Sequence, residues 1–189
     1  MDDENPPGLP DLLREGLKVV FVGINPSIFS ASQGHYFARK TNRFWPAFSR
    51  SVLSLAAREA IGASSLGPTH DRALLDHGFG FTDMVARPTA RASELNVTEF
   101  AAGAPLLIEK LERYRPGVAC FHGMTAYRIF HRMLGVDSEA VLGAQPLRIA
   151  GARLFVVPNP SPANAHSSPA DQTLWYDRLW AFVMEGAER

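Results

Sequence analysis

The sequence predicts an α/β fold: a three-layer sandwich in which helices flank a central, mostly parallel β-sheet. Four apolar runs, at residues 17–24, 79–85, 117–122 and 153–157, are each long enough for one buried strand. Segments with helical patterning separate these runs, and strands that alternate with helices of ten or more residues are typical of parallel sheets. The 189 residues contain no internal repeat and no linker, so we expect one domain over residues 1–189, with 1–16 as a lead-in segment.

Helices are expected between these strands and after the last one. They cover residues 43–59, 71–77, 98–114, a segment from Gly123 to about Leu134, and a final amphipathic helix that opens at Ser168-Pro169. Asn42 is a suitable N-cap for the first of them, which has Pro46 in its first turn. Gly78 closes the second helix, and Pro116 stops the third.

The remaining segments are predicted as loops, apart from one hairpin. A short helical turn is expected near Leu12, a long polar loop covers 25–41, and a second loop covers 158–168. Unstructured loops as long as 25–41 inside compact domains are usually functional. Residues 147–150 and 153–157 are predicted to pair as a hairpin about Gly151.

The composition is that of a globular protein. Hydrophobic residues make up 46% of the chain and charged residues 20%, and no apolar run approaches the ~20 residues of a membrane span. The acidic start of the chain lacks the apolar core of a signal peptide, so we expect a cytoplasmic protein, and we expect it to be a monomer. Its 19 basic and 19 acidic residues give no net charge, which argues against a broadly cationic coat but not against a local basic patch.

The sequence gives no indication of a metal or a cofactor. The lone cysteine, Cys120, excludes an internal disulfide and any CxxC site, and we expect it to be a small core residue. The six histidines show neither metal-ligand spacing nor an HExxH motif.

The most informative residue is Asn25, which follows the first strand directly. In open α/β sheets, ligands bind outside the carboxyl ends of the strands, and Pro26 fixes the turn that presents the Asn25 amide. An amide cannot release a proton near neutral pH, but it can orient a water molecule or read a hydrogen-bonding edge. The alternative is an Asn that only caps the following turn. Asp83, His122 and the segment 158–166 also follow strands, so all four loops are expected to meet at one crevice.

Several short motifs resemble those of one known family, the uracil-DNA glycosylase superfamily, and most closely its mismatch-specific branch. The matching pieces are Gly23-Ile-Asn-Pro26, Phe37-Ala, Asn42-Arg-Phe-Trp45, Gly80-Phe-Thr, Arg87-Pro-Thr89 and Pro158-Asn-Pro-Ser161. They extend from about Leu17 to the final helix, so the resemblance covers nearly the whole chain and implies the fold of that superfamily. One such motif alone would be weak, whereas the set in this order and spacing is specific.

This resemblance implies a monofunctional glycosylase without metal or redox cofactor. Its substrate would be double-stranded DNA that contains uracil, notably opposite guanine, and its product an abasic site. Such an enzyme must flip the base out of the helix, because the bond to be broken is inaccessible in the stack. Two alternatives stay open: a relative that acts on other damaged or single-stranded bases, and a DNA-binding module with the same fold and no turnover. A flavodoxin-like nucleotide binder is disfavoured, since the chain has no phosphate-binding glycine loop.

The resemblance also implies roles for individual residues. Asn25 matches the residue that positions water, and the backbone N–H groups beside it, including that of Ile24, are candidates for binding the leaving base. Phe37 matches the aromatic residue on which the flipped base stacks, the alternative being a core Phe. A rigid wedge would enter the minor groove and replace the extruded base, the alternative being a proline-rich connector. The wedge comprises Asn159, Pro160, Ser161, Pro162, Ala163, Asn164 and His166.

Basic residues near these motifs are candidates for contacting DNA phosphates. Arg39, Lys40 and Arg43 flank the stacking Phe, and Arg87 and Arg91 form a second pair one loop away. We expect a modest and salt-sensitive affinity for duplex DNA from so few charges.

Asp83 is a catalytic candidate on chemical grounds. Many relatives have a non-acidic residue at this position, so the family assigns it no role. A carboxylate can nevertheless accept a proton from water and can face a cationic sugar, which an amide cannot do. The alternative is a carboxylate that pairs with Arg87 or caps a turn. Whether Asn25 or Asp83 activates the water stays open at this point.

The sequence departs from its relatives at three of these positions. The wedge segment Pro162-Ala-Asn-Ala-His166 lacks the Arg that some relatives place at its end, and His166 either substitutes for it in part or is simply exposed. Ser27 follows Asn-Pro where close relatives commonly carry Gly, so we expect a pocket floor that is tighter or that gains a hydroxyl group. His122-Gly-Met124 stands where relatives often have Gly followed by Lys, which removes one expected phosphate contact.

Overall fold

The computed structural model describes residues 6–136, 139–165 and 167–187, and the description below is confined to these ranges. Five strands form one sheet in the order β2-β1-β3-β5-β4. They are β1 (Val19–Gly23), β2 (Phe79–Asp83), β3 (Val118–His122), β4 (Gly143–Ile149) and β5 (Ala152–Val157). All neighbouring strands are parallel except β4 and β5, which form an antiparallel pair. The predicted α/β architecture with a mostly parallel sheet is confirmed.

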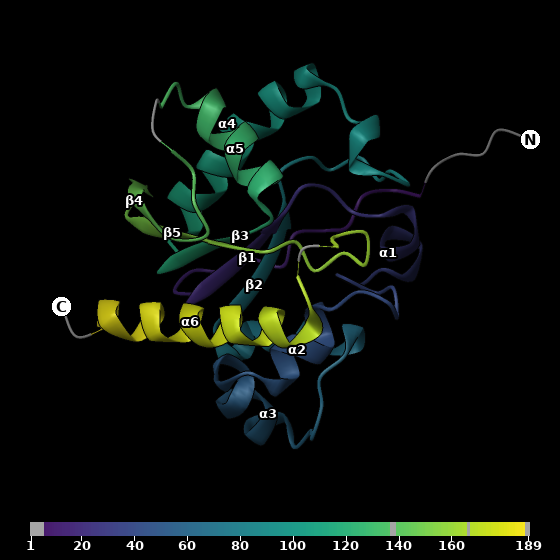
Figure 1. Cartoon of the computed structure of the whole chain (residues 1–189), viewed down its shortest axis with the longest axis vertical. Coiled ribbons are helices and arrows are strands. Elements are labelled where there is room, and N and C mark those ends of the chain that lie inside the picture. Colours follow the sequence, from purple (N-terminus) through teal and green to yellow (C-terminus); the bar gives the residue numbers. More distant parts are fainter. Residues whose placement is uncertain (1–5, 137–138, 166, 188–189) are drawn as a thin grey trace, which may run out of the picture.

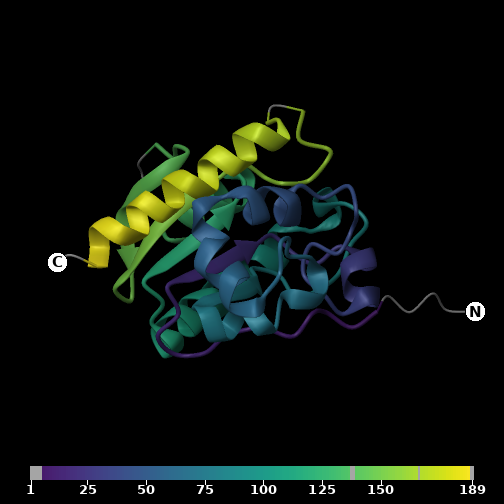
Figure 2. The same cartoon turned by 90° about the horizontal axis from the view of Figure 1, so that it is seen from below.

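Helices cover both faces of this sheet. Figure 1 shows α4 (Val97–Tyr114) and α5 (Met124–Met133) on one side, and α2 (Phe44–Arg50), α3 (Leu55–Ile61) and α6 (Pro169–Ala187) on the other. In Figure 2 the second layer lies in front, with α6 beside α2 and α3. The short α1 (Ile28–Gln33) lies at the end of the sheet where β1 stops.

Strand alternation divides the core into two apolar clusters, one on each face. Val20 and Val22 of β1 pack in the cluster under α4 and α5, whereas Val19 and Phe21 pack in the cluster under α2 and α6. Successive side chains of a strand point to opposite faces, so an apolar run without polar interruptions fits a strand covered on both sides. The α2 and α6 side is rich in aromatic residues, and Phe21 contacts Phe44 with ring centroids 5.1 Å apart.

The long helix α4 shows how sequence signals fix an element. Asn96 accepts a hydrogen bond from the Glu99 N–H at 3.0 Å, and the Glu99 carboxylate accepts one in return from the Asn96 N–H at 3.0 Å. This capping box satisfies two N–H groups that would otherwise lack partners. Phe100, Leu107 and Leu111 are buried along one face of the helix, at the spacing expected for an amphipathic helix.

Two predicted helical segments differ in the structure. The predicted helix over 43–59 is interrupted: α2 ends at Arg50, a 3-10 turn covers Val52–Ser54, and α3 follows. Ser51 is extended (φ −79°, ψ 156°), and its hydroxyl donates to the Phe48 carbonyl at 2.7 Å. Serine hydroxyls that compete for backbone groups favour such interruptions. The predicted short helix before Gly78 is a 3-10 helix, Ala73–His77.

The predicted loop over 25–41 and the predicted helical turn near Leu12 also differ from the structure. The loop over 25–41 contains α1, which Ser27 caps by accepting a hydrogen bond from the Ser30 N–H at 3.0 Å. No helical turn forms at Leu12. Instead, Leu12 makes an antiparallel bridge to Phe81, with both N–H···O distances at 2.9 Å. The lead-in segment therefore covers part of β2.

Within the described ranges, no helix combines the length and the apolar character that crossing a membrane requires.

Candidate active site

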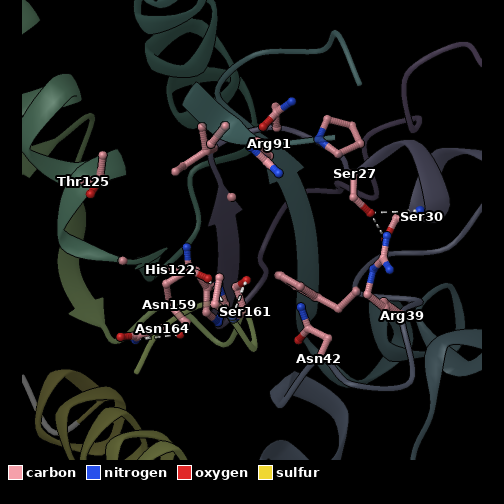
Figure 3. A pocket seen from close by; sticks show the side chains of 18 of the residues that line it. Ser27, Ser30, Arg39, Asn42, Arg91, His122, Thr125, Asn159, Ser161 and Asn164 are labelled. Carbon is pink, nitrogen blue, oxygen red and sulfur yellow. Dashed lines mark hydrogen bonds between the residues drawn. The ribbon is translucent and has the colours of Figure 1, made fainter. Parts of the chain in front are cut away.

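A pocket of about 1030 Å³ opens at the carboxyl ends of β1, β2, β3 and β5. The four loops that leave these strands all contribute to its wall, through Asn25, Asp83, the His122-Gly123 corner and the segment that begins at Pro158. Figure 3 shows Asn159, Ser161 and Asn164 grouped with His122, facing Ser27, Ser30 and Arg39. The structure therefore brings together residues that are more than 130 positions apart in the chain.

The Asn25 side chain is fixed in one orientation. Its Nδ2 donates to the Arg87 carbonyl oxygen at 2.8 Å and to the Thr89 Oγ1 at 2.7 Å. A carbonyl oxygen can only accept, so the amide nitrogen must face Arg87, and both of its hydrogens are used. The Oδ1 atom of Asn25 therefore remains as the acceptor available for a water molecule. Thr89, which the sequence did not assign a role, lies within the Arg-Pro-Thr motif and is almost fully buried.

Asp83 stands directly beside Gly23. The two residues are partners in the β1–β2 register, and a Cβ atom at position 23 would collide with the Asp83 Oδ1. The Asp83 carboxyl lines the pocket, and burial raises its pKa to about 7, with a further rise from the Asp11 carboxylate and an opposing effect of Lys110. Removal from water disfavours the charged form of an acid, which explains the direction.

Arg87 does not pair with Asp83, so that alternative is wrong. The Arg87 guanidinium instead forms an ion pair with Glu99, with Nε–Oε1 at 2.6 Å, and donates to the Glu94 carbonyl at 3.0 Å. This pairing lowers the pKa of Glu99 to about 2. Asp83 is left with a raised pKa and no side-chain hydrogen bond among the described residues.

A charged network lies behind Asp83 on the β2 side. Lys110 forms an ion pair with Asp11 at 2.7 Å, and the Thr82 hydroxyl donates to Asp11 at 2.6 Å. No local pattern in the sequence indicates this network, because its members come from the lead-in segment, β2 and α4. Their charges act on the pKa of Asp83 in opposite directions, so burial decides its value.

Phe37 has one side in the core and lines the pocket with the rest of its half-buried ring. It stacks on Phe44 with centroids 4.4 Å apart and planes 16° from parallel. Its φ of 53° is unusual for a residue with a bulky side chain. Neighbouring bonds hold this conformation: the Trp45 Nε1 donates to the Tyr36 carbonyl at 2.9 Å, and buried Asp71 accepts from the Tyr36 N–H at 3.0 Å. The core-Phe alternative thus describes only one side of the ring.

Ile24 also lines the pocket and is half-buried. Its carbonyl oxygen accepts a hydrogen bond from the Val85 N–H at 2.9 Å, which continues the β1–β2 pairing past the end of the strands. The backbone around Asn25 is therefore held at a fixed position relative to β2.

The predicted wedge is a compact loop that carries its own hydrogen bonds. The Asn159 Oδ1 accepts from the Ser161 N–H at 2.9 Å, and the Asn164 Nδ2 donates to the Asn159 carbonyl at 3.0 Å. Pro160 is buried, whereas Pro162 and Ala163 are exposed at the tip. His166, the last residue of the predicted wedge, lies outside the described residues.

Arg43 anchors this loop. Its Nη1 lies 2.8 Å from the carbonyl oxygens of both Asn164 and Ser167, and its backbone N–H donates to the Pro160 carbonyl at 2.9 Å. This structural role was not predicted from the sequence. A phosphate contact of Arg43 stays a prediction, and its guanidinium is committed to the loop.

The other basic candidates lie at the rim. Arg39 and Arg91 are exposed and line the pocket, and Lys40 is exposed. The Arg39 guanidinium lies over the Phe29 ring, 5.4 Å from its centroid. Among the described residues, no group of three or more His, Cys, Asp or Glu side chains is arranged to hold a metal ion.

Comparison with known proteins gives a consistent family assignment. A sequence profile described as the uracil DNA glycosylase superfamily matches residues 10–182. The chain is 34% identical over 173 residues to a Schizosaccharomyces pombe (strain 972) protein named G/U mismatch-specific uracil DNA glycosylase. That alignment covers 89% of this chain and 51% of the relative, so the chain spans about half the length of this curated protein.

A solved structure supports the fold independently. The solution NMR structure of a candidate uracil DNA glycosylase from Methanosarcina acetivorans superposes with a TM-score of 0.55 at 21% sequence identity. It covers 96% of this chain and 98% of that one, which extends the similarity to the whole fold. The profile match alone spans most of the chain, from the lead-in segment into α6. The chain therefore belongs to the uracil DNA glycosylase superfamily.

Proposed function

We propose that this protein is a monofunctional DNA glycosylase. It flips uracil out of double-stranded DNA, notably from G:U mismatches, and hydrolyses the N-glycosidic bond to leave an abasic site. The observation that carries the proposal is the fixed Asn25 amide, whose Oδ1 is left as an acceptor in a pocket that Phe37 and Asp83 also line. The name of the Schizosaccharomyces pombe relative supports the choice of uracil opposite guanine.

The flipped base stacks on Phe37. Flipping is required because the glycosidic bond is inaccessible inside the duplex. Phe44 supports the Phe37 ring from its other side at 4.4 Å, so the stacking surface is rigid before DNA binds. A stacking contact of this kind contributes about 1–3 kcal/mol per base.

Two side chains share the handling of the water. Asn25 orients it through Oδ1, and Asp83 accepts its proton as the oxygen attacks C1′ of the sugar. The electron pair of the broken bond leaves with the base, which is then protonated. The transition state is expected to resemble an oxocarbenium ion, so a carboxylate nearby also stabilises its positive charge.

The loop from Asn159 to Asn164 takes the place of the extruded base. Its exposed tip, Pro162-Ala163, is the part available to enter the duplex. Because internal hydrogen bonds and Arg43 already order the loop, little conformational entropy is lost when it binds. Arg39, Lys40 and Arg91 would meet phosphates at the rim, and one copy of the chain would suffice for the reaction.

The test uses labelled oligonucleotides that carry G:U, G:T, A:U or single-stranded uracil. The wild-type protein, Asn25→Ala and Asp83→Asn are compared under single-turnover conditions, with Asp76→Asn as control. Asp76 is exposed and forms an ion pair with Arg14 far from the pocket. We expect abasic sites with the wild type and the control, fastest for G:U, and losses of about 10²-fold or more for the two pocket variants.

Each alternative has its own result. Faster cleavage of single-stranded uracil than of G:U would identify a single-strand enzyme of the same superfamily. Tight duplex binding without any abasic site would identify a binding module. Near-full activity of Asp83→Asn together with loss in Asn25→Ala would leave the carboxylate without a part in the chemistry.

A further inference from the structure

His122 ends β3 and lies in the same row of the sheet as the proposed catalytic residues. Val22 pairs with Phe121, so the following residues, Gly23 and His122, continue that register, and Gly23 pairs with Asp83 on its other side. Residues in one row point to the same face of the sheet. Because Gly23 has no side chain, the Asp83 carboxyl fits over it, with Oδ1 where a Cβ atom would lie, and Gly23, Asp83 and His122 all line the pocket.

Aromatic packing fixes the plane of the His122 ring. Its centroid lies 5.1 Å from that of Phe37 and 5.4 Å from that of Phe44, and these two rings are stacked 4.4 Å apart. The near-equal distances place His122 beside the Phe37–Phe44 stack rather than on its outer face. A base that stacks on Phe37 would therefore meet His122 with an edge.

One hydrogen bond bears on which ring nitrogen of His122 carries the proton. Its partner is the hydroxyl group of Tyr176, a fully buried residue of α6. That hydroxyl lies 3.0 Å from the His122 Nε2. A tyrosine hydroxyl can donate to a neutral imidazole nitrogen, and the hydrogen of that imidazole then lies on its other nitrogen, here Nδ1.

The Nδ1 atom of His122 is buried and has no hydrogen-bond partner among the described residues. His122 as a whole is only 2% exposed, and burial lowers its pKa to about 3, so the ring stays neutral near pH 7. A buried donor without an acceptor is unfavourable, and native proteins keep few of them. Such a donor at a pocket wall is accounted for by a ligand atom that accepts its hydrogen.

We propose that the Nδ1–H group of His122 donates a hydrogen bond to a carbonyl oxygen of the flipped pyrimidine. This assignment rests on the proposed glycosylase function and adds a base-reading residue to it. Negative charge moves onto the base as the glycosidic bond breaks, so a fixed donor binds the departing base more strongly than the intact nucleotide. In this assignment Tyr176 is a positioning residue, since its hydroxyl sets the tautomer and does not touch the base.

Nuclear magnetic resonance tests the tautomer without any turnover. In the free protein, long-range ¹H–¹⁵N spectra are expected to show a neutral His122 with its proton on Nδ1 between pH 5 and 8. Addition of duplex DNA carrying pseudouridine opposite guanine, whose carbon–carbon glycosidic bond resists cleavage, is expected to shift the Nδ1–H resonance. Tyr176→Phe is expected to release the tautomer toward Nε2–H. A wild-type ring protonated on Nε2, or an Nδ1–H resonance unmoved by bound DNA, overturns the assignment.

Single-turnover excision then tests the contact itself. His122→Leu is expected to lose about 10²-fold in rate with G:U DNA. Sulfur is a poorer hydrogen-bond acceptor than oxygen, so one of the two bases 2-thiouracil and 4-thiouracil is expected to be excised by the wild type more slowly than uracil. His122→Leu is expected to excise that same thio base and uracil at equal rates. The matched control for Tyr176→Phe is Tyr127→Phe, because Tyr127 is equally buried on the other face of the sheet and its hydroxyl has no partner among the described residues.

The outcomes separate this inference from the function beneath it. If the wild type makes no abasic sites, the glycosylase proposal fails while the tautomer result still stands or falls in the spectra. If the wild type is active and His122→Leu is equally fast, the base-reading role is wrong. If His122→Leu unfolds, Tyr176→Phe still tests the proposal. An unchanged His122 tautomer and an unchanged excision rate in that variant reject the assignment.

Discussion

The pocket combines one amide that cannot titrate with one carboxyl that titrates near neutral pH. Asn25 has both amide hydrogens engaged by Arg87 and Thr89, and Asp83 is held beside Gly23 with a pKa of about 7. The two residues therefore suit different tasks: the amide fixes a position, and the carboxyl moves a proton. Which of the two residues activates the water stays a prediction, and this division of tasks is a proposal that kinetics can test.

The pH dependence of excision should report the ionisation of Asp83. A general base works only when deprotonated, so with a pKa of about 7 the rate is expected to rise with pH through that value and to level off above it. Asp83→Asn should lower the rate by about 10²-fold or more and remove this rise. Single-turnover rates between pH 5 and 9 check the prediction. A flat wild-type profile would contradict it.

Gly23 should be required for the position of the Asp83 carboxyl. A methyl group at position 23 collides with the Asp83 Oδ1. Gly23→Ala is therefore expected to slow excision about 10-fold or more by moving the Asp83 carboxylate away from the water. Gly67→Ala is the control, because nothing lies within 4 Å of its added Cβ and its φ of −142° suits any residue. Excision rates and thermal unfolding are measured together. A fully active Gly23→Ala would show that the carboxyl position is not critical.

Among the elements, the loop from Asn159 to Asn164 owes its shape to a residue far away in the sequence. Arg43, immediately before α2, reaches two carbonyl oxygens near the end of the loop and binds Pro160 through its backbone. The planar guanidinium can serve several acceptors at once, which a lysine ammonium on a flexible stem does less well. Rigidity of the loop is thus supplied by α2 as much as by its prolines.

Arg43→Lys should separate the wedge from the chemistry. Loosening the loop is expected to reduce excision from G:U duplex about 10-fold, with a smaller loss on single-stranded uracil, where no base has to be replaced. Arg50→Lys is a suitable control, since Arg50 is exposed at the other end of α2. Rates on the two substrates are compared within each variant. Equal losses on both would indicate that Arg43 acts on the pocket as a whole.

For the whole molecule, the balance of 19 basic and 19 acidic residues limits DNA affinity. The basic groups at the rim include Arg39, Lys40 and Arg91, whereas Arg87 is neutralised by Glu99. Binding should therefore depend on a few phosphate contacts and fall with salt, because each contact releases counterions from the DNA. Affinity would then come mainly from the flipped base and the wedge loop.

Removing Lys40 should weaken binding to every duplex about equally. Lys40→Ala is expected to reduce the slope of log K against log salt by about 1, with little change in the ratio of G:U to A:U binding. Lys18→Ala serves as control, because Lys18 directly precedes β1 and so lies at the end of that strand away from the pocket. The measurement is a salt titration of duplex binding. It is made with proteins that also carry Asn25→Ala, so that the bound DNA is not cleaved. A change in the substrate ratio would instead place Lys40 in base recognition.

The sequence by itself determined the four parallel strands, the α/β class and the position of Asn25 at the end of β1, whereas β4 begins at Gly143, four residues before the predicted 147–150. These features follow from local rules: apolar runs, helix caps and turn residues act over a few neighbouring positions. The motifs around Asn25, Phe37 and Pro158 also pointed to the family, and the profile match confirms it. The break between α2 and α3 was missed because it depends on how serine hydroxyls bond in the folded chain.

Only the tertiary structure decided what surrounds each side chain. The pairing of Arg87 with Glu99 and the anchoring of the wedge by Arg43 both join residues distant in sequence. The burial of the His122 Nδ1, without a hydrogen-bond partner among the described residues, also depends on the packing around it. The pKa of Asp83 likewise depends on burial against β1 and on charges from the lead-in segment and α4. Hydrogen-bond partners and desolvation are properties of packed neighbours, so no local pattern in the chain can specify them.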